Sequence, residues 1–122
     1  MPPGAAPPRT RPSRGEIWQV DLNPAVGRET NKVRPALVLS VNALNHGPAE
    51  LVIVAPVSTV DKRIPTHVRI PAGEGGQTEI GFIKCEEVKS ISTARFLRKR
   101  GTAHPATVER ALGIVKILLG IH

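Results

Sequence analysis

Residues 14 to 40, RGEIWQVDLNPAVGRETNKVRPALVLS, hold two strand patterns joined by a polar segment. From residue 16 to 22 the chain alternates, with Trp18, Val20 and Leu22 on one face, which is typical of a half-buried strand. We expect Trp18 in the core or in the wall of a groove. The runs PALVLSV at 35 to 41 and LVIVAPV at 51 to 57 are mostly apolar and indicate strands buried on both faces. Residues 23 to 33 show neither the alternation of a strand nor the periodicity of a helix. They are rich in turn formers and charge, which predicts an exposed loop.

The rest of the chain adds further strands and a final helix. Runs bounded by Pro, Asn and Gly predict strands at residues 51 to 57, 66 to 70 and 81 to 88, with a glycine-rich turn at 72 to 79. Residues 105 to 120 predict a helix that begins with a proline and stops at a glycine. These elements predict a mainly β fold, a small antiparallel β-barrel with a C-terminal α-helix.

The predicted helix is apolar on nearly all sides. Its apolar positions are Val108, Ala111, Leu112, Ile114, Val115, Ile117, Leu118 and Leu119. Such a helix needs burial on more than one side. It is therefore either sunk in the barrel or packed against a second subunit.

The chain is short and basic. Its 122 residues fit one domain, which we predict over residues 15 to 122, after a Pro- and Arg-rich tail at 1 to 14 that we expect to be disordered. The formal charge is +7, and the tail holds three arginines and no acid, so the domain keeps +4. A positive surplus favours a polyanionic partner such as a nucleic acid, although many basic proteins bind none.

Metal and membrane sites are not indicated. Cys85 is the single cysteine, and the four histidines show no metal-ligand spacing with it, so no metal and no cofactor is predicted. Cys85 is best interpreted as a small buried side chain in a strand. The longest apolar stretch is interrupted by Lys116 and is too short to cross a bilayer, and we expect a cytoplasmic protein.

Arg34 stands between the polar loop and Pro35. A proline disfavours the helical region for the residue before it, so Arg34 is expected to be extended, with its guanidinium held at the mouth of the next strand. From this dipeptide alone, an ordinary surface arginine is the favoured interpretation.

The quoted stretch closely resembles the opening of the MazF/PemK family of toxin endoribonucleases. The family pattern runs G-[DE]-[IV]-W-x-V-D-[FL]-[DN]-P, then G-x-E, then RPA-[LV]-V-[LV]-S. The resemblance continues through VIVAPVST at residues 52 to 59, PTHV at 65 to 68 and EEVKSI at 86 to 91. It therefore covers nearly everything from Gly15 to the final helix.

The resemblance implies an SH3-like or CcdB-like β-barrel with a C-terminal α-helix and short additional helices. It further implies a homodimeric toxin of a toxin-antitoxin system, an mRNA interferase. Such a toxin cuts single-stranded RNA at short preferred sequences without metal, in a groove that spans both subunits. A cognate antitoxin would normally occupy that groove.

The resemblance also implies the catalytic residues. The arginine of the RPA motif falls on Arg34, the acid of G-x-E on Glu29, and the catalytic threonine on Ser58, with Thr59 beside it as the second choice. The family commonly has glutamine where this chain has Glu87, which either alters base preference or is structural.

Metal-free RNA cleavage uses the ribose 2′-hydroxyl as the nucleophile, giving 2′,3′-cyclic phosphate and 5′-hydroxyl ends. The planar fork of the Arg34 guanidinium suits the phosphate charge, Glu29 suits a general base or an ion pair with Arg34, and a hydroxyl positions the phosphate. The general acid stays unassigned. Further RNA contacts are predicted for Arg28, Asn31, Lys32, Lys62, Arg63, His67 and Glu87. For His67, a solvated ring is favoured over one that stacks on a base.

Two rival functions remain open at this point. One is a toxin of the same fold that acts on gyrase without catalysis, against which the RPA motif and the following hydroxyl argue. The other is an RNA-binding module that does not cleave, for which the positive charge would suffice.

Overall fold

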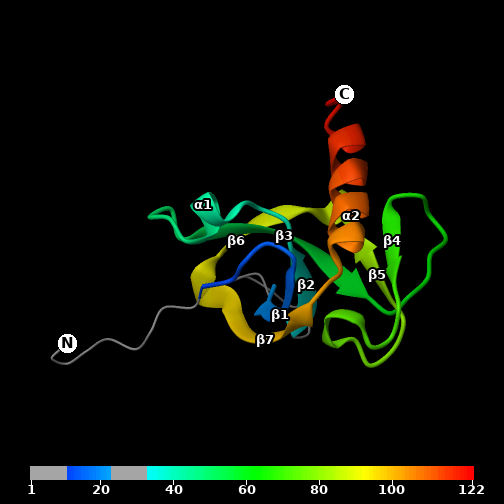
Figure 1. The fold of residues 1–122 in the computed structure, drawn as a ribbon, viewed down its shortest axis with the longest axis horizontal. Helices are drawn as coiled ribbons and strands as arrows, with labels where there is room; N and C mark the ends of the chain where they lie inside the picture. Colours follow the sequence, from blue (N-terminus) through cyan, green and yellow to red (C-terminus); the bar gives the residue numbers. More distant parts are fainter. Residues whose placement is uncertain (1–10, 23–32) are drawn as a thin grey trace, which may run out of the picture.

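The computed structural model describes residues 11–22 and 33–122 (Figure 1). Its strands are β1 (Glu16–Asp21), β2 (Val33–Val38), β3 (Leu51–Ser58), β4 (His67–Ile70), β5 (Gly81–Lys84), β6 (Lys89–Ser92) and β7 (Phe96–Thr102). Its helices are α1 (Asn42–Asn45) and α2 (Pro105–Leu118), with 3₁₀ turns η1 (Glu74–Gly76), η2 (Cys85–Glu87) and η3 (Thr93–Arg95). The predicted mainly β fold with a C-terminal helix is confirmed. No helix of the described residues is long and apolar enough to span a membrane.

Strand β3 organises the sheet because it pairs along both edges. The sheet order is β4-β5-β3-β2-β1-β7, with β6 also on β3, and every pair is antiparallel. Along one edge β3 meets β2, with Ala36 opposite Pro56. Along the other it meets first β6 and then β5, with Ser58 opposite Phe82. The sheet curls around its core as the predicted barrel requires, but backbone pairing of the described strands does not close the ring (Figure 1).

Two of the predicted strands end earlier in the structure than expected. The strand expected at 81 to 88 ends at Lys84, where η2 turns the chain, and the strand expected at 35 to 41 ends at Val38. Strands β6 and β7 were not predicted. Their sequences, KSIS and FLRKRGT, are mostly polar or charged, and each contributes one buried apolar side chain, Ile91 and Phe96. Such strands carry too weak a hydrophobic pattern to be recognised from sequence.

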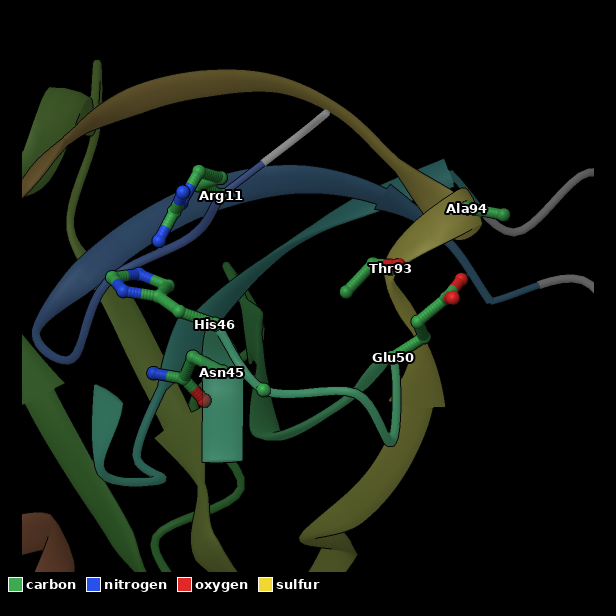
Figure 2. A pocket seen from close by; sticks show the side chains of 7 residues that line it. Arg11, Asn45, His46, Glu50, Thr93 and Ala94 are labelled. Carbon is green, nitrogen blue, oxygen red and sulfur yellow. The ribbon is translucent and has the colours of Figure 1, made fainter. Parts of the chain in front are cut away.

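The chain is packed against the domain before the predicted boundary at Gly15. Pro12 is fully buried, and its carbonyl oxygen lies 3.0 Å from Nε2 of His46 at the end of α1. Arg11 and His46 line a small hollow of about 180 Å³ between this segment, α1 and η3. Figure 2 shows these side chains. Residues 1–10 of the predicted tail lie outside the described residues.

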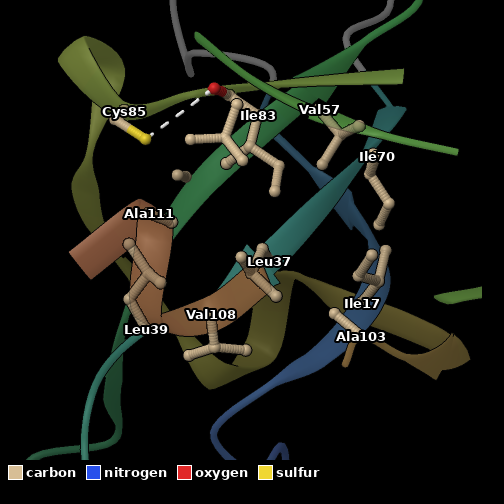
Figure 3. Packing of buried hydrophobic residues seen from close by; sticks show 12 residues of the cluster. Ile17, Leu37, Leu39, Val57, Ile70, Ile83, Cys85, Ala103, Val108 and Ala111 are labelled. Atoms are coloured by element: carbon tan, nitrogen blue, oxygen red, sulfur yellow. Dashed lines mark hydrogen bonds between the residues drawn. The ribbon is translucent and has the colours of Figure 1, made fainter. Parts of the chain in front are cut away.

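The core consists of two apolar clusters on opposite faces of β2 and β3. Ile17, Leu37, Val57 and Ile83 pack with α2 in the first (Figure 3). The second contains Val20, Ala36, Val38, Val52, Val54, Ile91 and Phe96, and Trp18 packs against it. Burial of β2 on both faces is thus confirmed, as is the placement of Trp18. For β3 the prediction holds only in part, because Leu51 and Ile53 are exposed.

Cys85 is completely buried in the first cluster, as expected, although in η2 rather than in a strand (Figure 3). Its thiol lies 3.8 Å from the carbonyl oxygen of Ile83. Burial, and secondarily the charge of Glu86, raises the pKa of the Cys85 thiol to about 11. The thiol is therefore protonated at neutral pH and is a poor nucleophile.

Helix α2 is covered only along its first half. Thr107, Val108 and Ala111 are buried, whereas Ile117 and Leu119 are 70% and 65% exposed. The second half projects from the sheet (Figure 1). Of the two arrangements expected from the sequence, burial of the whole helix in the barrel is wrong.

Candidate functional site

A cavity of about 280 Å³ opens at the ends of β1, β2 and β3. Its lining residues are Leu22, Arg34, Pro56, Val57, Ser58, Lys84, Glu87 and Lys89. The cavity thus joins segments far apart in the sequence. It contains three of the predicted site residues, namely Arg34, Ser58 and Glu87.

Arg34 reaches this cavity from β2. Ala36 lies opposite Pro56, so continuing the same antiparallel register places Arg34 opposite Ser58. Arg34 is exposed, and its guanidinium has no hydrogen bond or ion pair with any other residue that the structure describes. No described residue occupies its N–H donors, so these donors are available to bind an anion.

The Ser58 hydroxyl is oriented by the backbone that follows it. Its Oγ accepts a hydrogen bond of 3.0 Å from the backbone N–H of Val60. Because the oxygen acts as the acceptor there, its own hydrogen stays free to be donated. Thr59 is exposed and does not line the cavity, so Ser58 is the better placed of the two hydroxyls.

Lys84, Glu87 and Lys89 give the cavity a positive surplus. Lys84 Nζ lies 3.1 Å from Glu87 Oε2. Together with Arg34 there are three cations and one acid around the cavity, an arrangement that attracts a polyanion. Lys84 and Lys89 were not among the predicted site residues. The sequence GFIK indicated this placement of Lys84. Ile83 is buried in the core, and the next residue in a strand points to the opposite face.

A hydrogen-bonded cluster anchors the neighbouring turn η2. Glu86 accepts a hydrogen bond of 2.7 Å from the hydroxyl of Thr66, and its other oxygen lies 2.9 Å from His67 Nε2. Burial alone would raise the pKa of Glu86, but the hydrogen bonds from Thr66 and His67 outweigh it and lower that pKa. Glu86 therefore holds the turn from one side while Glu87 faces the cavity on the other.

The structure corrects the prediction for His67. Its side chain is only 4% exposed, and Nδ1 is buried without a hydrogen-bond partner among the described residues. His67 is held there by Glu86 and lies under α2, lining a separate groove with Ile114 and Ile117. A solvated ring is therefore wrong, and stacking of this ring on a base at the cavity is not supported.

The other predicted site residues fall into two groups. Lys62 and Arg63 are exposed in the segment between β3 and β4 and do not line the cavity. Arg28, Glu29, Asn31 and Lys32 lie outside the described residues. Within residues 11–22 and 33–122, no group of three or more His, Cys, Asp or Glu side chains is arranged to hold a metal ion.

Comparisons with known proteins identify the family. A family profile described as "PemK-like, MazF-like toxin of type II toxin-antitoxin system" matches residues 13–119. The chain is 34% identical over 113 residues to Endoribonuclease MazF9 of Mycobacterium tuberculosis, covering 88% of this chain and 96% of that protein. It is 31% identical over 110 residues to Endoribonuclease toxin MazF of Escherichia coli, covering 89% and 95%.

Solved structures agree with this assignment. The chain matches the MazE-MazF structure of Deinococcus radiodurans with a TM-score of 0.79 and 27% identity, over 92% of this chain and 98% of that chain. The match extends over β1 to α2 rather than over one motif. The chain therefore belongs to the PemK-like, MazF-like family of toxins of type II toxin-antitoxin systems.

Proposed function

We propose that this protein is the toxin of a toxin-antitoxin system and acts as an endoribonuclease on single-stranded RNA. The observation that carries the proposal is that the Arg34 guanidinium, which has no partner among the described residues, and the Ser58 hydroxyl line one basic cavity. The relatives are named endoribonucleases, which disfavours a gyrase-directed toxin of the same fold.

The proposed reaction needs only groups of the protein and the RNA. The 2′-oxygen attacks the adjacent phosphorus as it gives its proton to a base, and the bond from phosphorus to the 5′-oxygen breaks as that oxygen takes up a proton from an acid or from water. The products carry a 2′,3′-cyclic phosphate and a 5′-hydroxyl. Arg34 stabilises the extra negative charge of the pentacoordinate phosphate, and the Ser58 hydroxyl donates to a phosphate oxygen.

Other roles in the proposal rest on the family resemblance. Glu29 serves as general base or orients Arg34, and Arg28, Asn31 and Lys32 contact RNA from the same loop. Lys62 and Arg63 track the RNA backbone from their exposed segment. Glu87 contacts the RNA from the wall of the cavity.

The proposed assembly is a homodimer with a shared RNA groove, active in the cytoplasm. The projecting half of α2 supports a dimer because it leaves Ile117 and Leu118 exposed, together with Leu119 directly after the helix. A cognate antitoxin is expected to offer an acidic, partly disordered segment to the basic groove.

The test is cleavage of a mixed-sequence RNA by purified protein in EDTA, with analysis of the fragment ends. We expect 2′,3′-cyclic phosphate and 5′-hydroxyl ends. Arg34→Ala should slow cleavage by about a hundred- to a thousandfold, the usual effect of removing one preorganised donor. Arg98→Ala is the matched control, because Arg98 is an exposed arginine on β7 outside the cavity. No cleavage by the unmodified protein, or undiminished cleavage by Arg34→Ala, would contradict the proposal.

A further inference from the structure

Lys84 lies in the cavity because of the pairing between β5 and β3. Ile83 is completely buried in the first apolar cluster, so strand alternation directs Phe82 and Lys84 to the opposite face. Ser58 lies opposite Phe82 in the adjacent strand. Lys84 therefore lines the cavity from the strand next to Ser58, while Arg34 approaches from β2 on the other side.

The burial of Lys84 is unusual for a lysine. Its side chain is only 19% exposed, whereas lysine side chains are mostly solvated. An ammonium that is largely withdrawn from solvent is stabilised by an opposite charge, and the Glu87 carboxylate lies 3.1 Å from it. Glu87 is 46% exposed, so the ion pair stands at the boundary between the cavity wall and solvent.

The backbone restrains this ion pair. Lys84 ends β5, and Glu87 ends the 3₁₀ turn that follows it. The turn is tied down by Glu86 through its bonds with Thr66 and His67. The carboxylate of Glu87 is thus presented from a fixed turn rather than from a free loop.

We propose that Lys84 is a second cationic phosphate-binding group of the cleavage site, and that Glu87 holds its ammonium in place when RNA is absent. The inference rests on the proposed function. An ammonium has three N–H donors, and a single contact with Glu87 leaves two for phosphate oxygens. Lys84 keeps its proton throughout, so the bonds that form and break are those of the RNA.

The pair also sets how tightly RNA binds. In the free protein the Glu87 carboxylate lies 3.1 Å from the Lys84 ammonium, and an incoming phosphate must compete with that carboxylate. Removing the carboxylate should therefore strengthen RNA binding, whereas removing the ammonium should weaken both binding and cleavage.

The experiment compares Lys84→Gln, Lys84→Arg and Glu87→Gln with Lys99→Gln. Lys99 is a matched control because its ammonium pairs with Glu16 at 3.0 Å and does not line the cavity. Cleavage of a short single-stranded RNA gives kcat/KM. The same RNA with a 2′-deoxy nucleotide at the cleaved position cannot be cut, and its Kd is measured across salt concentrations.

We expect Lys84→Gln to lower kcat/KM by about a hundredfold, as the loss of a donor to the phosphate would. The slope of log K against log salt should fall by about 0.7, the value for one lost contact with single-stranded nucleic acid. Lys84→Arg should keep most of the kcat/KM and most of the salt slope of the unmodified protein, because the charge is kept. Glu87→Gln should tighten binding of the uncleavable RNA, and Lys99→Gln should change neither quantity.

The inference is overturned if Lys84→Gln, folded as judged by its melting temperature, cleaves and binds RNA like the unmodified protein. It is also overturned if Glu87→Gln changes only the base preferred in the RNA and not the affinity, because the ion pair would then serve to recognise a base. If Lys84→Gln does not fold, Lys84→Met keeps the apolar stem and serves for the same comparison. Failure of the unmodified protein to cleave refutes the proposed function instead, and the salt dependence of binding still decides the role of Lys84.

Discussion

The chemistry of the Ser58 hydroxyl depends on one hydrogen bond from the backbone. Its oxygen accepts from the Val60 N–H, which leaves the hydroxyl hydrogen free to be donated to another acceptor. Thr59, one residue on, is exposed and does not line the cavity. The two hydroxyls are thus neighbours in sequence but unequal in position.

Ser58→Ala should therefore reduce kcat for RNA cleavage by about a hundredfold, because a donor to the phosphate is lost. Ser58→Thr should keep most of the activity, since the hydroxyl is retained. Thr59→Ala is the control and should cleave normally. Single-turnover rates with saturating protein measure the effect on the chemical step, and a large loss in Thr59→Ala with none in Ser58→Ala would reverse the assignment.

At the scale of the secondary-structure elements, η2 links the cavity to the rest of the fold. It joins β5 to β6, both of which pair with β3, and Glu86 connects it to the start of β4. The turn thus lies where the pairing partner of β3 changes from β6 to β5. Its anchoring by Glu86 adds to the stability of this junction.

The lowered pKa of Glu86 predicts a pH-dependent contribution to stability. Its carboxylate stabilises the fold above the unfolded value of 4.5, and this stabilisation is lost as the pH falls through the lowered folded pKa. Glu86→Gln should destabilise the protein at pH 7 by about 1 kcal/mol, a modest value because solvent screens the partly exposed carboxylate.

Urea unfolding of both proteins between pH 7 and pH 3 measures this effect. The difference in unfolding free energy should be largest near neutrality and shrink below about pH 4.5, where Glu86 is protonated in the unfolded chain. A difference that stays constant over that range would mean that the charge of Glu86 does not contribute.

At the scale of the whole molecule, the two apolar clusters leave part of the apolar surface uncovered. The first cluster takes up the beginning of α2, but Ile117 and Leu119 remain outside it. A surface groove lined by Leu39, Ile53, Val88, Leu112 and Val115 runs beside the helix and continues to Leu119. The exposed half of α2 and this groove together form the apolar surface that the proposed dimer would bury.

Ile117→Asp combined with Leu119→Asp should convert the protein to a monomer, because burying two unpaired carboxylates in an interface is strongly unfavourable. Light scattering at micromolar concentration should give twice the chain mass for the unmodified protein and the chain mass for the variant. Leu97→Asp is the control, since Leu97 is 56% exposed on β7 and away from α2. A monomeric unmodified protein would rule out the shared-groove dimer.

Much of the fold could be predicted from local patterns. Alternation around Trp18, the apolar runs of β2 and β3 and the proline at the start of α2 reflect preferences of neighbouring residues, which a sequence displays directly. Arg34 and Ser58 could be named because the motifs that carry them resemble a known family. Strands β6 and β7 could not be predicted, since they are stabilised by pairing with β3 and β1 rather than by their own hydrophobicity.

The tertiary structure was needed for everything that depends on contacts between distant segments. Lys84 joins Arg34 and Ser58 because β5 pairs with the last residues of β3, a register that no local pattern encodes. His67 is buried where Glu86 binds it and the chain folds back beside α2, although a solvated ring was expected from the sequence. Short-range preferences thus predict which segments form strands and helices, whereas long-range pairing and burial determine which side chains share a site.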